Sequence, residues 1–441
     1  TACDSVVWNG VTYDSSGQFT YTPEFIQLGQ DIDGEAYDDH SGKSVSISAD
    51  GNIVAIGAFL NDGNGSNSGH VRVYESVGGS WSQIGQDIDG ESPGDLSGRS
   101  VSISDDGNIV AIGATGIHTH NSTAGHVRIY QNIGGSWSQI GQDILGEGSD
   151  DQSGFSVSLS SDGNTVAIGA YRNDGSYSNS GHVRIYQNIG GSWTQLGQDI
   201  DGEAADDYSG WSVSLSSDGI TVAIGAFGND ANGGNEYSSG HVRVFNWNDS
   251  SWIQLGQDID GQAADDWSGR SVSLSADGNI VAIGAPHSGN GSGYNSMEGY
   301  VSIYSYNGSA WNQVGQNIEG QADLDYCGVS VSLSDDGNRV AIGVPGNVGN
   351  GSQIAGYVSI YENIGGSWSQ IDQDINGEAQ LDKSGWSVSL SANGNTVAIG
   401  APGNDGNGVG AGHVRVYNLP TLTNTGGCDS TAILNLTITN A

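Results

Sequence analysis

The sequence of 441 residues is poor in positive charge, proline, cysteine, methionine and long apolar runs. It has 11 Lys and Arg against 50 Asp and Glu, so its formal net charge is −39 at pH 7. A field of that sign repels phosphate backbones and anionic headgroups, which argues against nucleic-acid binding and against attachment to an anionic membrane. No apolar run approaches the roughly 18 residues of a membrane-spanning helix, so we expect no membrane insertion.

Glycine is abundant, with 73 residues, whereas there are only 6 Pro and 1 Met. Gly-, Asn-, Asp- and Ser-rich stretches separate short runs of alternating large and small residues, and no stretch has a sustained apolar period of 3.6. This pattern predicts many short strands joined by tight turns. The chain starts at Thr1 without a signal peptide, which we interpret as a processed chain or a fragment.

A repeat of the form SGxSVS dominates the sequence, and internal repeats of this length indicate a modular architecture. Its glycine recurs at Gly42, Gly98, Gly154, Gly210, Gly269, Gly328 and Gly385. In the fourth copy the expected strands are Ser212–Ser216, Thr221–Ala226, His241–Phe245 and Trp252–Gly256. Seven units of four strands predict an all-β fold, a seven-bladed β-propeller, and a solenoid is the alternative.

The two ends of the repeat array complement each other. The last unit stops after His413–Tyr417 without its fourth strand, and Phe25–Gly29 supplies a matching segment before the first unit. We therefore expect the N-terminal strand to complete the last blade and to close a ring over residues 25–418. Closure removes the exposed strand edges that an open stack would leave.

Residues 1–24 and 419–441 lie outside the expected ring and each contains a strand-like pattern and one cysteine. Read together, they resemble the repeated β-modules of large secreted surface proteins of gliding bacteria. That resemblance implies a small discontinuous β-module into which the propeller is inserted, and a Cys3–Cys428 disulfide joining its halves in an extracellular chain. Cys327 replaces a repeat serine, and we expect it to be a buried free cysteine.

The repeat unit resembles the FG-GAP repeat. Gly284-Ala285-Pro286 and Gly400-Ala401-Pro402 keep one hallmark of that family, whereas Ser-Gly replaces its Phe-Gly. The resemblance implies a ring like the head of integrin α-subunits, and adhesion or ligand binding in place of catalysis. Integrin-type repeats often have a calcium loop between their first two strands. Here Ser48–Asn52 has one carboxylate, too few oxygens for Ca²⁺, so we expect a plain hairpin turn.

Acidic loops gather on one face of the predicted ring, which we call the upper face. It carries the connections from the second to the third strand and from the fourth strand to the next blade. Two interpretations remain open: a solvated acidic surface, or loops that bind Ca²⁺ through carboxylate, Asn and backbone oxygens. The candidate metal ligands are Asp62, Asp174, Asp206, Asp207 and Asp405.

Two positions vary from blade to blade where the innermost strand begins, near the channel mouth. Aromatic rings there could stack on sugars beside polar groups, and the alternative is that they only fill the gaps between blades. The candidate ligand-binding residues are Trp211, Trp386, Phe155, Tyr208, Trp267, Tyr326, Lys43, Arg99 and Arg270.

Histidine recurs at the start of the third strand, and arginine follows two residues later. Tyr300 and Tyr357 replace this histidine in two units, which favours a structural hydrogen bond over a metal site, and we expect the arginines to pair with nearby carboxylates. No unit contains a unique nucleophile–base set, so we expect no enzyme activity.

We therefore expect a secreted, cell-surface adhesion module whose partner is an extracellular glycan or a surface protein of another cell. The alternative is a structural assembly unit, as a homo-oligomer within a larger adhesin. A polysaccharide-active enzyme is the third and least favoured interpretation of the function.

Overall fold

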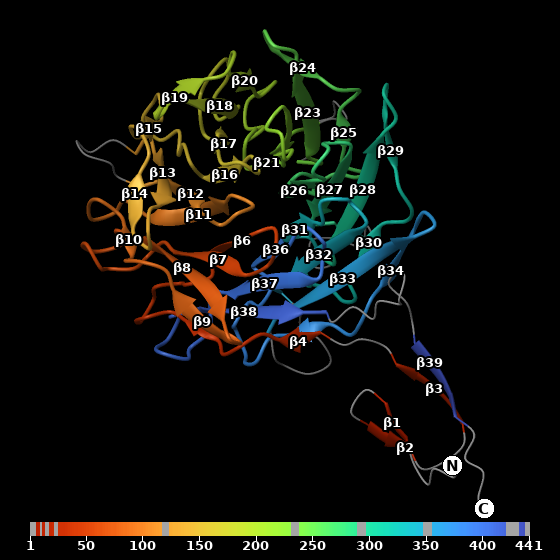
Figure 1. Cartoon of the computed structure of the whole chain (residues 1–441). Coiled ribbons are helices and arrows are strands. Elements are labelled where there is room, and N and C mark those ends of the chain that lie inside the picture. Colours follow the sequence, from red (N-terminus) through yellow and green to blue (C-terminus); the bar gives the residue numbers. More distant parts are fainter. Residues whose placement is uncertain are drawn as a thin grey trace, which may run out of the picture.

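Seven β-sheets are arranged radially around a central axis (Figure 1). The computed structural model describes residues 6–8, 11–13, 17–21, 25–116, 123–230, 238–288, 297–346, 355–419 and 432–436. None of these residues is helical, and accordingly none belongs to an apolar helix of membrane-spanning length. The predicted all-β, seven-bladed β-propeller is confirmed.

Six blades run from an innermost to an outermost strand in chain order, and the seventh takes its outermost strand from the N-terminal segment. The innermost strands are β6 (Ser44–Ile47), β11 (Ser97–Ile103), β16 (Ser156–Leu159), β21 (Ser212–Leu215), β26 (Ser271–Leu274), β31 (Ser330–Leu333) and β36 (Ser387–Leu390). The second strands are β7 (Ile53–Ala58), β12 (Ile109–Ala114), β17 (Thr165–Ala170), β22 (Thr221–Ala226), β27 (Ile280–Ala285), β32 (Arg339–Val344) and β37 (Thr396–Ala401). The third strands are β8 (His70–Val77), β13 (His126–Asn132), β18 (His182–Ile189), β23 (His241–Trp247), β28 (Tyr300–Tyr306), β33 (Tyr357–Ile364) and β38 (His413–Asn418).

The fourth strand of every blade is split into two segments that both pair with the third strand. In six blades the segments are β9 (Ser80–Gln83) and β10 (Ile88–Asp89), β14 (Trp137–Gln139) and β15 (Ile144–Leu145), β19 (Ser192–Gln195) and β20 (Ile200–Asp201), β24 (Trp252–Gln254) and β25 (Ile259–Asp260), β29 (Trp311–Gln313) and β30 (Ile318–Glu319), and β34 (Ser367–Gln370) and β35 (Ile375–Asn376). In five of these blades a left-handed glycine such as Gly85, with φ of 72°, interrupts the strand. The sequence predicted the first of these segments, as in Trp252–Gly256, and did not predict the second.

The N-terminal segment closes the ring, as predicted. β4 (Ile26–Gln27) and β5 (Ile32–Asp33) pair antiparallel with β38, in a register that sets Gln27 opposite Tyr417. In Figure 1 the red start of the chain accordingly lies beside the blue end of the propeller. The segment that leads into the first blade therefore supplies the outermost strand of the seventh blade and covers the edge of β38.

The serines of the repeat join neighbouring blades. Ser44 Oγ donates to the Gly98 carbonyl, and the equivalent bond of 2.8–2.9 Å recurs at every joint around the ring. The second serine accepts the backbone N–H of the next blade at 2.9–3.1 Å, as Ser46 does from Ile103. A Cβ at Gly57 would collide with the Gly98 carbonyl oxygen, which explains the repeated glycine of the second strand.

Branched side chains fill the space between blades. At one joint Val222 and Ile224 pack with Ile185 and with the small Ala167 of the preceding blade. The expected division into a large and a small face of the second strand is therefore present, and each face is fully buried.

Tryptophans hold the outer part of the joints. Trp137 Nε1 donates to the Ile84 carbonyl of the preceding blade at 2.9 Å, and five other joints have the same bond. The closing joint differs, because Phe25 replaces the Trp and Asp372 replaces the glycine against which that Trp packs. Here Phe25 N–H donates to Asp372 Oδ2 at 2.8 Å.

The terminal segments pair with each other outside the ring. β1 (Val6–Trp8) pairs with β2 (Val11–Tyr13), and β3 (Gly17–Tyr21) pairs antiparallel with β39 (Ala432–Leu436). These strands lie to one side of the propeller in Figure 1. Cys3 and Cys428 lie outside the described residues, so their disulfide stays a prediction. Cys327 is a free, buried cysteine, as expected.

Candidate functional site

A left-handed turn precedes the innermost strand of each blade on the upper face. The residue two positions before the repeat glycine has φ between 54° and 58° in all seven blades, although none of these residues is glycine. In the fourth blade the turn is closed by a hydrogen bond of 3.1 Å from Trp211 N–H to the Tyr208 carbonyl. Non-glycine residues seldom adopt this conformation, and such strain is typical of functional sites. The turn brings both variable positions of each blade to the channel mouth.

Aromatic side chains from successive blades form a connected cluster at this mouth. The ring centroids of Phe155 and Trp211 are 4.4 Å apart, and Tyr208 stacks on Phe227 at 5.3 Å. Trp267 lies 5.4 Å from Phe227 on the other side. The rings thus pack against each other, as the packing interpretation expected, while their half-buried edges stay accessible.

Positive side chains interleave with the rings. Lys43 Nζ lies 3.7 Å from the centroid of Trp386. The guanidinium of Arg99 lies 4.2 Å from the ring of Phe155, and that of Arg270 lies 4.4 Å from Trp211. Such cation–π contacts stabilise by about 0.5–2 kcal/mol each. We call these residues, with Tyr208, Trp267, Tyr326 and Lys383, the axial site.

Burial and mutual repulsion perturb the cations of the axial site. The pKa of Lys43 is lowered to about 6, first by burial and then by the positive charges of Arg99, Arg270 and Lys383. Burial also lowers the pKa of Arg99 and that of Arg270 to about 10. Charges shift one another's pKa only when they lie close together. These four cations therefore meet in one region, although their blades are far apart in the sequence.

A cavity of about 470 Å³ opens beside two of these cations, Arg270 and Lys383. It is lined by residues of the fifth, sixth and seventh blades, among them Trp267, Arg270, His287, Tyr326, Lys383 and Trp386. A volume of this size suits a small ligand of one or two rings. All nine ligand residues predicted from the sequence lie in this region. Five of them belong to the cluster of rings and cations: Phe155, Trp211, Tyr208, Lys43 and Arg99. The other four line the cavity: Trp267, Arg270, Tyr326 and Trp386.

A second layer of rings was missed in the sequence. It comes from the end of the second strand, where Phe59, Tyr171, Phe227 and His287 lie beneath the variable residues. His287 stacks on Trp267 with centroids 3.3 Å apart. The sequence did contain a signal for this second layer. In three blades an aromatic residue follows Gly-Ala, at the position where the FG-GAP hallmark has proline.

The predicted metal ligands are dispersed over the loops. The side chains of Asp62, Asp174 and Asp405 each accept a backbone N–H of their own loop at 2.7–3.0 Å. Asp206 accepts from the Asn179 amide, and Asp207 accepts the N–H groups of Glu203 and Ala204. Four of these carboxylates thus stabilise a turn of their own loop, and Asp206 joins two loops. Calcium binding by these residues stays a prediction.

The short hairpin between the first two strands is a self-contained turn. Asp50 Oδ1 accepts Ser48 Oγ–H at 2.7 Å and Asn52 N–H at 2.9 Å. Burial acts to raise the pKa of Asp50, but these hydrogen bonds outweigh it and lower the pKa. The carboxylate is already engaged, which agrees with the expected turn.

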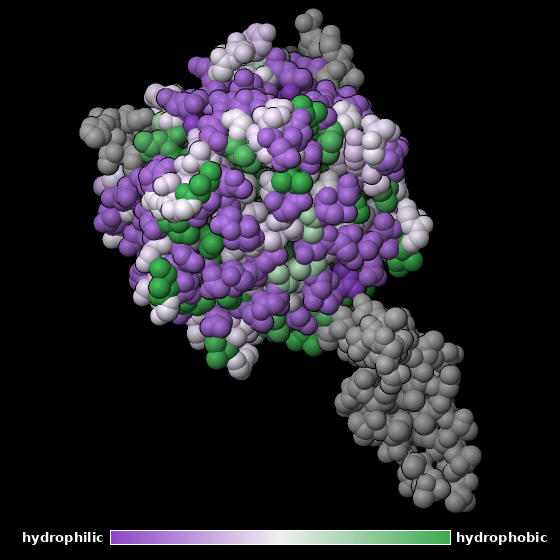
Figure 2. All heavy atoms as spheres, turned by 45° about the horizontal axis from the view of Figure 1, so that its top comes forward, coloured by the Kyte–Doolittle hydropathy of each residue, from purple (hydrophilic) through white to green (hydrophobic). Residues whose placement is uncertain are grey.

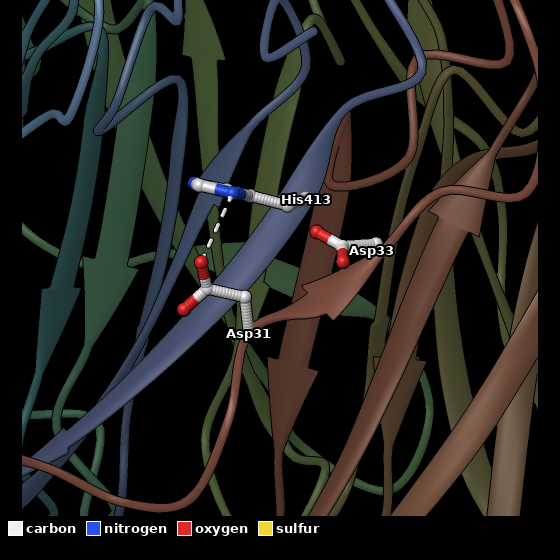
Figure 3. Close-up of side chains that lie close together, drawn as sticks. All are labelled: Asp31, Asp33 and His413. Carbon is white, nitrogen blue, oxygen red and sulfur yellow. Dashed lines mark ion pairs between the residues drawn. The ribbon is translucent and has the colours of Figure 1, made fainter. Parts of the chain in front are cut away.

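Closer groups of potential ligands surround four of the third-strand histidines. One contains Asp31, Asp33 and His413, and Figure 3 shows the two aspartates from the N-terminal segment beside His413 on β38. Another contains Glu35, His70 and Asp87. In each group one atom per residue lies within 4.8 Å of the others.

The two tyrosines at this position form the expected hydrogen bond. Tyr300 Oη donates to Asp266 Oδ2 at 3.1 Å, and Tyr357 does the same to Asp325 at 3.2 Å. The histidine contacts to carboxylates are longer, with 4.0 Å between His70 Nδ1 and Asp87 Oδ2. The structural hydrogen bond is therefore present at the two tyrosines, and for the histidines it stays a prediction.

The repeated arginines pair with loop glutamates, as expected. Arg72 Nη1 lies 3.3 Å from Glu35 Oε1, and the equivalent pairs span 3.4–3.6 Å. The Glu35 carboxylate beside His70 is therefore already neutralised by the buried guanidinium of Arg72. A fixed positive charge next to the ligands disfavours a bound cation.

Chelation tests the calcium prediction. Because the loop carboxylates bond to their own turns and the histidine groups lie beside arginines, we expect EGTA to leave the melting temperature unchanged within about 1 °C. Differential scanning calorimetry with added CaCl₂ and then with excess EGTA measures this. A melting temperature that rises with calcium and falls on chelation would contradict the expectation and support loop-bound Ca²⁺.

Comparison with known proteins agrees with the repeat. Residues 31–74 and 200–245 match the model of the family described as FG-GAP repeat. These segments run from β5 through most of β8 and from β20 through most of β23, so this chain contains FG-GAP repeats. A comparison with curated protein sequences found no match.

Among solved structures, the crystal structure of a "putative 6-phosphogluconolactonase" from Bacteroides uniformis superimposes with a TM-score of 0.54. The sequence identity is 14%, over 79% of this chain and 89% of the other. At that identity the likeness shows the shared fold alone.

Proposed function

We propose that this seven-bladed propeller of FG-GAP repeats is the recognition module of a secreted, cell-surface adhesin, and that it binds carbohydrate of another cell at the axial site. The observation that carries the proposal is the aromatic-lined cavity on the propeller axis, built from the positions that vary between otherwise constant blades. Partly exposed Trp and Tyr rings beside polar groups suit stacking of an aromatic face on a sugar. The repeats themselves are typical of adhesion proteins.

A glycan array tests this function. We expect the purified chain to bind a restricted set of glycans, and the double variant Trp211→Ala, Trp386→Ala to lose at least 10-fold in affinity because it removes two rings of the axial site. Tyr177→Ala is the matched control, because Tyr177 is an upper-face ring that is 53% exposed. Binding that survives the double variant, or that the control abolishes, would contradict the axial site.

The competing proposal is an assembly unit without a ligand of its own. It is favoured by apolar side chains at the tips of the hairpins between the third and fourth strands, where Ile133, Ile189 and Ile364 are 61–63% exposed. Figure 2 shows such apolar side chains as small separate spots on a mostly hydrophilic surface. Light scattering that finds a stable oligomer, lost in an Ile133→Ser, Ile189→Ser, Ile364→Ser variant, would favour this alternative.

A further inference from the structure

Positive charge is concentrated at the axial site of an otherwise acidic protein. Of the 11 Lys and Arg residues, Lys43, Arg99, Arg270 and Lys383 lie there. Five others pair with loop glutamates. Within the described residues none of the four axial cations makes an ion pair with a carboxylate; their recorded partners are aromatic rings.

Lys43, Arg99 and Arg270 are largely removed from water, whereas Lys383 is exposed, and burying those three cations together opposes folding. Desolvated cations that repel one another are unfavourable unless a counter-charge is present, and cation–π contacts offset only part of the cost. Fifty acidic residues are available in the chain, yet the described part supplies no carboxylate partner here. A cationic group that the fold leaves without a counter-ion, beside a cavity, is arranged for an anion from outside.

The cavity limits the size of that anion. Arg270 and Lys383 both line it, together with the rings of Trp267, Tyr326 and Trp386. The remaining surface of the upper face is acidic, so an extended polyanion would be repelled by the rim, whereas one small charged group can reach the axis.

We propose that the ligand of the axial site is an acidic saccharide, whose carboxylate or sulfate lies between Arg270 and Lys383 while its ring stacks on an aromatic side chain of the cavity. This inference rests on the proposed carbohydrate recognition and specifies its ligand class. Lys43 lies over the ring of Trp386 and Arg99 over that of Phe155, and both add to the positive potential.

Calorimetric titration with matched ligand pairs tests the inference. The probes are a galacturonic acid trisaccharide and its methyl ester, which share their rings and differ in charge, and a sulfated galactose disaccharide with its unsulfated form. We expect at least one acidic probe to bind at least 10-fold more tightly than its neutral partner, and the preference to shrink as NaCl is raised from 50 to 300 mM. Inorganic sulfate alone should bind far more weakly, because it lacks the ring.

Variants assign the effect to the cavity. Arg270→Met, Lys383→Met is expected to bring the ratio of acidic-probe to neutral-probe affinity close to 1, and this ratio, not the affinity for either probe alone, is the readout. Arg339→Met is the control, because Arg339 pairs with Glu362 away from the axis. Lys43→Met should weaken acidic binding and raise the melting temperature, a combination that a packing role does not produce.

The outcomes separate this inference from the proposed function. Equal binding of acidic and neutral probes would overturn the charged ligand and leave carbohydrate recognition standing. Binding of hexaglutamate or free sulfate as tightly as the acidic sugar would overturn the saccharide class. Lys43→Met with lower thermal stability and unchanged affinity would overturn the role of Lys43. No binding of any probe, together with an empty glycan array, would overturn both proposals.

Discussion

Lowering the pH from 7 to 5 is expected to destabilise the propeller by several kcal/mol. The pKa values of His70, His182 and His241 are lowered to about 4, first by burial and then by the arginine two residues further on, against an opposing pull from nearby aspartates. An unfolded histidine titrates near pH 6.5, so unfolding takes up a proton between pH 6.5 and 4. Their stabilisation is complete above pH 6.5 and is lost progressively as the pH falls toward 4, by about 2 kcal/mol per histidine at pH 5.

Urea denaturation at pH 7, 6 and 5 measures this dependence. Burial raises the pKa of Asp207 and of Asp266, which acts in the opposite direction, so the slope is compared with that of a matched variant. His70→Tyr, His182→Tyr, His241→Tyr copies the residue that two blades already have at this position, and it should flatten the curve. An unchanged slope in the triple variant would contradict the assignment to these histidines.

Deleting the closing strand is expected to cost at least about 3 kcal/mol and to cause aggregation. Removal of residues 1–30 takes away β4, the Leu28 carbonyl that accepts Trp81 Nε1–H at 2.8 Å, and the backbone bond from Leu28 N–H to Val416. It leaves the indole N–H unsatisfied and exposes the edge of β38.

Removal of residues 1–24 is the matched control, because it ends just before the ring. We expect that shorter deletion to leave the chain monomeric, with a melting temperature close to that of the intact chain. Thermal denaturation and size-exclusion chromatography compare the two deletions. Equal behaviour of both would show that the ring does not depend on β4.

The fold could be predicted because the same local pattern is written seven times. The alternation in Thr221–Ala226 shows which face must accept a neighbouring sheet, and the missing fourth strand after Tyr417 shows where the ring closes. The second segment of the outer strand was not predicted: a left-handed glycine such as Gly85 divides this strand, and sequence alternation does not reveal backbone conformation.

The site could be predicted only in part. Variation within a constant motif identified Trp211, Trp386 and the other candidate ligand residues. It did not show that the lysines and arginines among them lie close together. Lys43 and Arg270 are separated by four blades in the sequence, and only the circular arrangement brings their charges together. The net charge of −39 argued against anionic ligands. A sum over the whole chain does not reveal a local cluster of positive side chains.

Crystallising the protein with the galacturonic acid trisaccharide, at pH 7 and low salt, tests recognition at the axis most directly. The account predicts density for the sugar within the cavity, its carboxylate between Arg270 and Lys383 and one ring against Trp267, Tyr326 or Trp386. A saccharide bound at the outer rim or on the opposite face, with the cavity filled only by water, would contradict it.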